Sequence, residues 1–362
     1  MQKYCVVCDF EDGNLLKNRI FDESIANKYP GASVWPKIYC LLKGDNIDCI
    51  TADIYLDQKP YYKKVLYISD MTTKRTKEIL KSNVVPLLIS CAESPNVAWK
   101  FYHNLKKISS YFKYSLMFKG VENKISPKSS LQILHWPNPN RAIINTKNWE
   151  SKKFLVMVAS NKIQIEVNGK RNLYWLRFLY KNIYLQYLKI VDPLFSFKDL
   201  YKKRLDAINY FSHFEGFDLY GTKWNDVDNL DIKTQQSIKI LKPRSVNDKI
   251  STMSEYKFAL CFENCVFPGY ITEKIFDCFA AGTIPIYLGA PDISDYIPAD
   301  TFIDYRKYKN FEVLNKFLIN LTEKEIHKYL KAIHSYINSQ RYSIFTEELF
   351  ASKILEIIKS NL

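Results

Sequence analysis

The segment between residues 256 and 288 constrains the fold more than any other part of the sequence, because it has the order strand, loop, helix, strand. Tyr256–Phe262 and Ile284–Leu288 are short apolar runs, and residues 272–281 between them have the composition of a helix. Gly282 stands just past the end of that helix, where glycine is favoured because it readily adopts a left-handed backbone. Two consecutive strands joined by a helix usually lie parallel in one sheet. The segment therefore predicts a β-α-β unit.

The same kind of alternation extends over most of the chain. In the first third, short apolar segments alternate with polar or helical stretches, at 4–8, 34–42, 49–55, 64–68 and 84–91. A second α/β series follows residues 135–141, His-Trp-Pro-Asn-Pro-Asn-Arg, whose two prolines favour an interdomain connection. Because 362 residues exceed the length of an ordinary single domain, we expect two α/β domains.

We place the boundary between these domains near residue 145. The first domain is expected at 1–145 and the second at 146–320. From Thr322 onward, apolar residues recur at helical spacing, so we expect residues 321–362 to be a helical segment that packs back on the body of the protein.

The chain is basic, with 52 lysines and arginines against 38 acidic residues. This excess favours anionic partners but does not choose among nucleic acid, anionic lipid and a nucleotide phosphate. It is concentrated at residues 97–128, where seven lysines are interleaved with aromatic residues. A solvated helix face over a buried aromatic stripe is the favoured interpretation, and a membrane-surface patch is the alternative.

The sequence contains no apolar run near the roughly 20 residues that a membrane-spanning helix needs. The N-terminal residues also lack the pattern of a secretory signal. We therefore expect a cytoplasmic protein, with a peripheral position at the inner face of the membrane as the alternative if the basic stretch binds anionic lipid.

Residues 270–274, Tyr-Ile-Thr-Glu-Lys, open the helix of the β-α-β unit and predict an anion site. The first turn of a helix presents unpaired N–H groups and a positive dipole end, which attract a diphosphate, and Lys274 adds a full charge. We expect Thr272 to cap the helix, Glu273 to reach a sugar or ribose hydroxyl, and Tyr270 to pack against the ligand. The alternative is an ordinary helix start with a solvated Lys274.

Several sequence blocks resemble the donor-site signature of the α1,3-fucosyltransferase family. They are Tyr-Lys-Phe-Ala-Leu-Cys-Phe-Glu-Asn at 256–264, Gly-Tyr-Ile-Thr-Glu-Lys-Ile-Phe at 269–276, Ala-Gly-Thr-Ile-Pro-Ile-Tyr-Leu-Gly at 281–289 and Tyr-Ile-Pro-Ala-Asp-Thr-Phe-Ile at 296–303. Weaker similarity extends back to Ala-Glu-Ser-Pro-Asn at 92–96. The resemblance implies a GT-B fold, in which two Rossmann-like domains face each other across a cleft. It also implies metal-independent, inverting transfer of fucose from GDP-fucose to a sugar hydroxyl.

The same resemblance implies roles for individual residues. Glu93 would be the catalytic base that deprotonates the acceptor hydroxyl. The other implied residues would bind the donor, with Lys274 and Arg171 neutralising the diphosphate; they are Asn161, Arg171, Asn264, Tyr270, Glu273 and Lys274. Two departures from the family are the segment 265–269, Cys-Val-Phe-Pro-Gly, after the Phe-Glu-Asn block, and Cys91-Ala92 before Glu93, where bacterial relatives often carry Gly-Glu-Asn.

No metal site is expected. Asp226-Val-Asp228 matches the D-x-D motif of metal-dependent sugar transferases, but it lies in a polar stretch that is typical of a solvated loop. Cys5 and Cys8 form one C-x-x-C without a second pair, and the five histidines have no ligand spacing. We interpret the eight cysteines as buried, reduced thiols.

Two alternatives to a fucosyltransferase stay open. The first is a GT-B transferase for another nucleotide sugar, and the second is a basic nucleic-acid-binding protein, which the compact diphosphate motif disfavours. For the acceptor, we expect an oligosaccharide, with transfer to O3 of GlcNAc in a lactosamine-type glycan of a surface polysaccharide, of the kind found in Lewis antigens.

Overall fold

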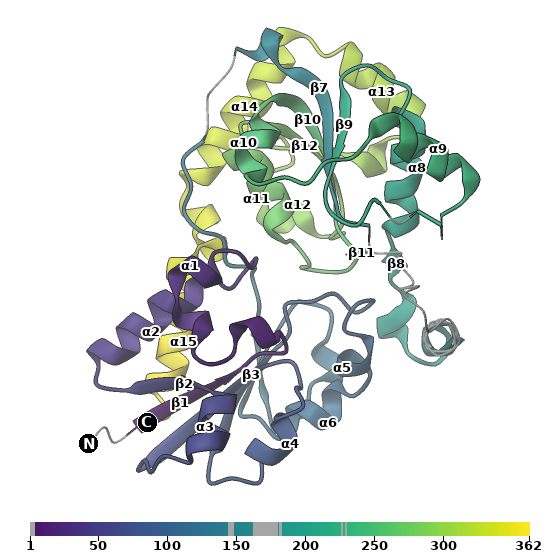
Figure 1. The fold of residues 1–362 in the computed structure, drawn as a ribbon. Helices are drawn as coiled ribbons and strands as arrows, with labels where there is room; N and C mark the ends of the chain where they lie inside the picture. Colours follow the sequence, from purple (N-terminus) through teal and green to yellow (C-terminus); the bar gives the residue numbers. More distant parts are fainter. Residues whose placement is uncertain (1–3, 144–147, 162–179, 181–182, 226, 229) are drawn as a thin grey trace. The chain divides into compact units, whose positions relative to one another are not determined.

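A computed structural model describes residues 4–143, 148–161, 180, 183–225, 227–228 and 230–362. The packing of the chain forms two compact units, one of Met1–Asn140 with Ser343–Leu362 and the other of Arg141–Tyr342. Each unit is an α/β structure built on a parallel sheet (Figure 1). No helix in these ranges has the length and apolar character of a membrane span.

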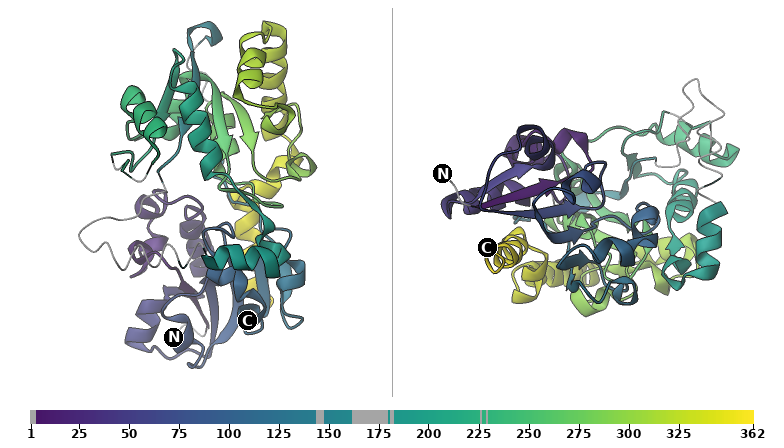
Figure 2. Two further views of the ribbon diagram at one scale, coloured as in Figure 1. Left: turned by 90° about the vertical axis from the view of Figure 1, so that its right-hand side faces the viewer. Right: turned by 90° about the horizontal axis from the view of Figure 1, so that it is seen from below.

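The residues after 320 are helical, as expected from the sequence, and they are divided between the two units. Helix α14 (Glu323–Ile337) packs on α11 (Glu273–Ala280) of the second unit, whereas α15 (Glu347–Lys359) packs on α2 (Val34–Gly44) of the first. Each helix buries its own apolar face, so each belongs to the unit whose core it covers. Figure 2 shows the C-terminal end returning to the unit that contains the start of the chain.

The first unit contains a six-stranded sheet. In spatial order its parallel strands are β2 (Asp48–Thr51), β1 (Tyr4–Asp9), β3 (Lys64–Asp70), β4 (Val85–Ser90), β5 (Tyr114–Met117) and β6 (Ser130–Ile133). Besides α2 and α15, its helices are α1 (Glu23–Ala26), α3 (Ala52–Gln58), α4 (Thr76–Ile79), α5 (Trp99–His103) and α6 (Leu105–Ser109), with 3-10 turns at Gly13–Leu15, Arg19–Phe21 and Glu122–Lys124.

Two of the apolar segments in this unit have different structures. The segment 34–42 is helical, because Val34, Ile38 and Leu42 are buried at a spacing of one helical turn. The segment 49–55 is divided at Thr51, where β2 ends and α3 begins.

The basic stretch 97–128 has the solvated face that its sequence favoured. Of its seven lysines, six are exposed and Lys124 is half-buried, while Trp99, Phe101, Tyr102, Phe112 and Phe118 are buried beneath them. All eight cysteines are free thiols, and seven of them are buried; Cys40 on α2 is exposed.

The second unit contains a five-stranded parallel sheet. In spatial order its strands are β13 (Ile303–Asp304), β12 (Ile284–Leu288), β10 (Tyr256–Phe262), β7 (Lys153–Val158) and β9 (Phe217–Tyr220); a separate antiparallel pair is formed by β8 (Lys198–Asp199) and β11 (Cys265–Val266). Besides α11 and α14, its helices are α8 (Tyr201–Phe211), α9 (Ile232–Leu241), α10 (Lys249–Ser254), α12 (Ile293–Tyr296) and α13 (Phe311–Ile319). Its 3-10 turns are Trp149–Ser151, Pro193–Ser196 and Tyr305–Lys307, and Gln340–Phe345 leads from α14 towards α15.

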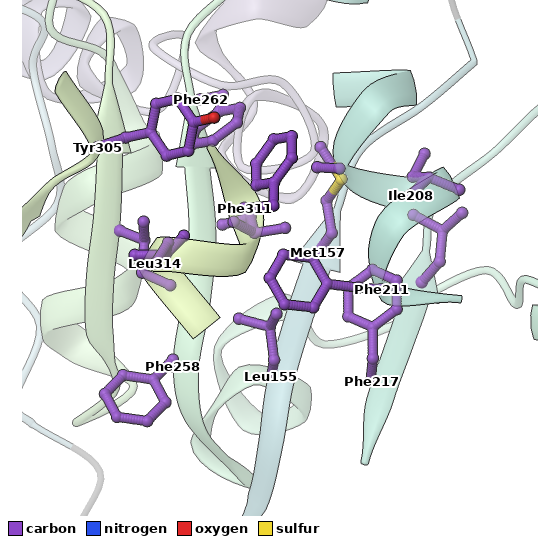
Figure 3. Packing of buried hydrophobic residues seen from close by; sticks show 14 of the residues in the cluster. Leu155, Met157, Ile208, Phe211, Phe217, Phe258, Phe262, Tyr305, Phe311 and Leu314 are labelled. Carbon is purple, nitrogen blue, oxygen red and sulfur yellow. The ribbon is translucent and has the colours of Figure 1, made fainter. Parts of the chain in front are cut away.

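Helices cover both faces of this sheet, α8 and α9 on one side and α10, α11 and α14 on the other (Figure 1). Between α8, α13 and the sheet lies an aromatic core (Figure 3). Phe211 of α8 and Phe311 of α13 meet edge to face with ring centroids 5.8 Å apart, and Met157 of β7 belongs to the same cluster. The predicted β-α-β unit is β10, α11 and β12, with Gly282 in the left-handed conformation after the helix.

Both sheets have a point at which the strand order reverses direction. In the first unit the chain goes from β1 to β2 on one side of β1 and then to β3 on its other side. In the second unit it goes from β7 to β9 on one side of β7 and then to β10 on its other side. In open parallel sheets, ligands bind beside the carboxyl ends of the strands at such a point. The fold thus directs attention to the loops after β1 and β3, and to those after β7 and β10.

Gly221 fixes the distance between the loop after β7 and the loop after β9. Its φ of 140° lies in a region that glycine adopts readily, and a Cβ atom here would collide with the backbone oxygen of Ala159, just after β7. The loops are joined at this point by a hydrogen bond from the backbone N–H of Asn161 to the backbone carbonyl of Thr222, at 3.0 Å.

We expect Gly221→Ala to lower the free energy of unfolding by about 2–5 kcal/mol, because backbone strain and a backbone clash both arise. Urea unfolding followed by circular dichroism measures this. Gly44→Ala is the control, since nothing lies within 4 Å of the added atom, and it is expected to change the free energy by less than about 1 kcal/mol. Equal effects of the two substitutions would contradict the account.

Candidate functional site

A buried carboxylate occupies the entrance to α11 in the second unit. Glu263 follows β10 directly and is 0% exposed. One carboxylate oxygen accepts the backbone N–H of Thr272 at 2.9 Å, and the other accepts from the Nζ of Lys274 at 2.9 Å. The Thr272 hydroxyl donates to the same carboxylate. The protein therefore places its own anion at the helix start, beside the lysine that the sequence predicted for a diphosphate.

This arrangement corrects one expectation. Thr272 stands at the N-cap position of α11, but its side chain makes no capping hydrogen bond to the helix because its hydroxyl is engaged with Glu263. The Glu263 side chain has room only because residue 289 is glycine: a Cβ atom there would lie 2.5 Å from the Glu263 Cγ. The Ala-Gly-Thr-Ile-Pro-Ile-Tyr-Leu-Gly block and the Phe-Glu-Asn block are thus coupled by packing.

The ammonium of Lys274 is held in a fixed direction. It donates to Glu263 and, at 2.8 Å, to the hydroxyl of Thr272, while Glu273 lies 3.7 Å away. An ammonium has three N–H donors, so within the described part of the chain one remains for a ligand. The Lys274 side chain is 22% exposed, which leaves that donor a path to solvent.

The charges around Lys274 keep Lys274 and Glu273 ionised. Burial opposes the charge of Lys274, but the carboxylates of Glu263 and Glu273 raise its pKa above the usual value. Burial likewise acts to raise the pKa of Glu273, but Lys274 and Lys249 lower that pKa to about 2. At neutral pH Lys274 and Glu273 therefore both carry a full charge.

A second layer of charge supports α11 one turn further along. Asp277 accepts from Lys249 of α10 at 2.6 Å and from Arg141 at 2.8 Å. Asp277 lies four residues after Glu273, on the same side of the helix, so Lys249 acts on both carboxylates. Sequence analysis did not identify either basic residue, because they come from a loop and a helix far from the motif.

Asn264 and Tyr270 are brought together, but beneath the surface. The Asn264 side-chain amide donates to the Tyr270 hydroxyl at 3.1 Å, and the two residues are 5% and 2% exposed. Arg204 of α8 donates to the Asn264 side-chain oxygen at 3.0 Å and to the Phe262 carbonyl at 2.7 Å. The three side chains hold the loop after β10 in place. No sequence signal identified Arg204, which lies within an ordinary amphipathic helix.

Asn161 and Arg171 were the remaining predicted donor residues. Asn161 follows β7, the strand next to β10, so it stands at the same edge of the sheet as Glu263 and is 3% exposed. Arg171 lies outside the described residues.

Glu93, the predicted base, lies in the first unit and lines a cavity of about 460 Å³. It follows β4 in a loop whose backbone is held by a hydrogen bond from the Tyr102 hydroxyl to the Glu93 carbonyl, at 3.0 Å. The same cavity is lined by Asp70, at the end of β3. Asp70 was missed, although the rule that pointed to Glu93, an acidic residue at the end of a buried strand, applies to it equally.

Asp70 carries an unfavourable charge in this cavity. Burial raises its pKa to about 6, with the Glu93 and Asp9 carboxylates adding to the rise and a hydrogen bond from Ser90 opposing it. Its neighbour Met71 has a φ of 60°, a left-handed conformation that is uncommon for a side chain of this kind. Charge strain and backbone strain of this sort gather at functional sites.

The described residues include no group of three or more histidine, cysteine or acidic side chains placed to hold a metal ion. Of the D-x-D motif, Asp226 lies outside the described residues, and Asp228 follows in the loop before α9.

Comparisons with known proteins match part of this chain. Residues 190–351 match the model of "Glycosyltransferase family 10 (fucosyltransferase) C-term". The human protein "4-galactosyl-N-acetylglucosaminide 3-alpha-L-fucosyltransferase 9" is 43% identical over 97 residues, 26% of this chain and 26% of its own length. The Helicobacter pylori "Alpha-(1,3)-fucosyltransferase FucT" is 36% identical over 95 residues, 26% of this chain and 17% of its own. The matched part thus spans about a quarter or less of these relatives.

Solved structures resemble the fold over the whole chain. An α1,3-fucosyltransferase has a TM-score of 0.52 at 16% identity, covering 99% of this chain and 90% of its own. Anabaena Alr3699/HepE in complex with UDP has a TM-score of 0.56 at 10% identity, covering 99% and 100%. At such low identity these likenesses establish the expected two-domain glycosyltransferase fold and no more.

The raised pKa of Asp70 predicts how the stability of the protein depends on pH. Because the folded state holds this proton more tightly than the unfolded chain, whose pKa is near 3.8, the stability falls as pH rises from about 4 to 6. We expect the Asp70→Asn protein not to lose stability in this way. At pH 8 its free energy of unfolding should exceed that of the parent by up to about 3 kcal/mol, and at pH 4 it should not exceed that of the parent.

Thermal unfolding of both proteins at the two pH values measures the effect. Asp57→Asn, at an exposed site on α3, is the matched control and should shift neither value. A destabilisation by Asp70→Asn that is the same at both pH values would contradict the assignment.

Proposed function

We propose that this protein, whose residues 190–351 match the glycosyltransferase family 10 model, is an inverting α1,3-fucosyltransferase that uses GDP-fucose. The observation that carries the proposal is the ammonium of Lys274, held at the entrance to α11 by a buried carboxylate. It lies within the matched domain and at the sheet edge where nucleotides bind in folds of this kind.

The chemistry of the donor supports this site. When GDP leaves the sugar, negative charge grows on the diphosphate, and a cation fixed beforehand stabilises that charge without having to reorganise. Lys274 has such a fixed direction, and the helix start adds its dipole. We propose that Arg171 adds a second charge and that a metal ion is not needed for this step.

Of the other donor residues, we propose that two contact the donor directly and two support the pocket from beneath. Glu273, ionised and 24% exposed, would accept a hydrogen bond from a hydroxyl of the ribose or fucose. Asn161, at the end of the neighbouring strand, would contact the nucleotide. Asn264 and Tyr270 would shape the pocket from beneath, since their hydrogen bond and burial keep the loop after β10 in position.

Glu93 is proposed as the general base. A carboxylate that removes the proton from the acceptor hydroxyl, on the face opposite the departing diphosphate, accounts for inversion at the sugar carbon. Its place at the carboxyl end of β4, in a cavity of the first unit, suits an acceptor sugar.

The acceptor is proposed to be a lactosamine-type glycan, with fucose joined to O3 of GlcNAc. The support is the name of the human relative, a 4-galactosyl-N-acetylglucosaminide 3-α-fucosyltransferase. Surface polysaccharide as the natural acceptor, a cytoplasmic location and contact of residues 97–128 with an anionic membrane stay predictions from the sequence.

A transferase for another nucleotide sugar is the second candidate, because the described contacts at α11 would suit any diphosphate. Incubating the protein with GDP-fucose, GDP-mannose and UDP-sugars separately, with N-acetyllactosamine and EDTA, distinguishes them by release of the nucleoside diphosphate. Release from GDP-fucose alone is expected. Turnover of another donor without turnover of GDP-fucose would overturn the donor assignment.

Lys274→Ala is expected to lower kcat about 10²–10³-fold in this assay, because one fixed donor to the leaving group is lost. Lys316→Ala, in an exposed ion pair with Glu312 on α13, is the matched control and should retain full activity. A Lys274→Ala protein that folds normally and keeps its activity would refute the role of Lys274.

Glu93→Gln is expected to lower kcat about 10²–10⁴-fold while leaving the dissociation constant for GDP unchanged, because the base acts on the acceptor alone. Glu78→Gln, at an exposed position on α4, serves as its control. Loss of GDP binding together with activity would show that Glu93 has a different role.

A further inference from the structure

The cavity that contains Glu93 has walls of an unusual composition. It lies at the strand-order reversal of the first unit, and it is lined by residues that follow or end β1, β3, β4, β5 and β6. Its volume of about 460 Å³ is in the range of small-molecule sites. Phe350 of α15 closes part of it, so the C-terminal helix contributes to the site.

The lining is acidic and aromatic. Four carboxylates line the cavity: Glu11, Asp12, Asp70 and Glu93. Five aromatic side chains join them: Phe10, Tyr29, Trp35, Trp136 and Phe350. Among the described lining residues none is lysine, arginine or histidine, although the chain as a whole has a net charge of +14. The local charge of the cavity is therefore opposite to that of the protein.

Trp136 is placed to serve as a platform. It follows β6 and is half-buried, whereas Trp35 is nearly covered. Gly31, with a φ of 76°, lets the chain approach the indole ring, because a Cβ atom there would lie 3.2 Å from it. The Trp136 carbonyl accepts from the side chain of Asn138 at 2.9 Å. The Gly31 backbone thus lies against the ring, and Asn138 holds the backbone that carries it.

These walls match one class of ligand. The apolar face of a sugar ring packs on an aromatic side chain, and its hydroxyls donate to carboxylates. Anionic ligands are disfavoured, because each would bring a like charge against at least two carboxylates with no described cation among the lining residues.

We propose that this cavity selects an uncharged sugar ring of the acceptor and rejects sialylated, sulfated or phosphorylated rings. Trp136 packs on the sugar ring, and Asp70 binds a hydroxyl near the one that Glu93 deprotonates. This selection rests on the proposed function, because it assumes that the ring in the cavity belongs to the acceptor. Asp70 is a positioning residue here, and Glu11 at the exposed rim contributes charge alone.

The test compares transfer to N-acetyllactosamine with transfer to the same glycan sulfated or sialylated on its galactose. The parent protein is expected to have a kcat/KM at least about tenfold higher for the neutral glycan. Trp136→Ala should raise KM for the neutral glycan about tenfold with little change in kcat, and Trp136→Phe should restore most of the loss.

The charge variants separate selection from binding. Glu11→Gln should lower the preference for the neutral glycan several-fold. Asp70→Asn should both lower this preference and raise KM for the neutral glycan, because a strong acceptor of hydrogen bonds is lost. Equal transfer to neutral and anionic glycans, or an unchanged KM and preference in both Trp136→Ala and Asp70→Asn, would overturn the proposal.

Failure of the proposed function gives a different result. The same samples are tested for GDP binding by calorimetry and for hydrolysis of GDP-fucose without acceptor. A protein that binds GDP and transfers fucose, yet shows no charge preference, contradicts only the inference about the cavity. A protein that neither binds GDP nor uses GDP-fucose contradicts the proposed function. In that case saturation-transfer NMR still tests the cavity: binding of the neutral glycan that is weakened by Trp136→Ala would support it as a sugar site.

Discussion

The ion pair between Glu263 and Lys274 organises the second unit around its sheet edge. A carboxylate that is fully buried must be paired or hydrogen-bonded, and Glu263 meets this need with the Thr272 amide, the Thr272 hydroxyl and the Lys274 ammonium. The end of β10, the start of α11 and Gly289, which directly follows β12, are thereby fixed relative to each other. A lysine on an exposed helix start would move freely, whereas this one has a set direction and, among the described contacts, one donor left for a ligand.

Charge is arranged differently in the two units, although both follow the same geometric rule. In each, the residues of interest lie beside the carboxyl ends of parallel strands where the strand order reverses. The second unit places paired charges there, with Lys274 among carboxylates that keep it ionised. The first unit places acids among aromatic rings, with no lysine, arginine or histidine among the described lining residues, and burial together with repulsion from Glu93 and Asp9 raises the pKa of Asp70. One environment suits a leaving diphosphate and the other a neutral polyol.

The sequence was sufficient to predict the features that depend on local periodicity. The β10-α11-β12 unit, the strand ends at Glu93 and Glu263, and the helical C-terminal residues all follow from runs of apolar residues and a glycine after a helix. The distribution of α14 and α15 between two units could not be predicted, because either helix had an apolar face that either core could cover.

Long-range partners were the part of the site that the sequence did not reveal. Arg204 and Lys249 reach the motif from other helices, and no local pattern marks such residues. The Thr272 hydroxyl was predicted to cap a helix because that is its usual local role, but a distant carboxylate competes for it and prevails. Asp70, in contrast, stood at the end of an apolar strand and was open to the same argument as Glu93.

The most direct test of the central claim is the position of the diphosphate in a crystal structure of the protein with GDP. The account predicts a diphosphate oxygen within about 3 Å of the Lys274 Nζ, with the carboxylate of Glu263 still accepting the Thr272 amide. A diphosphate bound away from the entrance to α11, with Lys274 still turned wholly towards its own carboxylates, would contradict it.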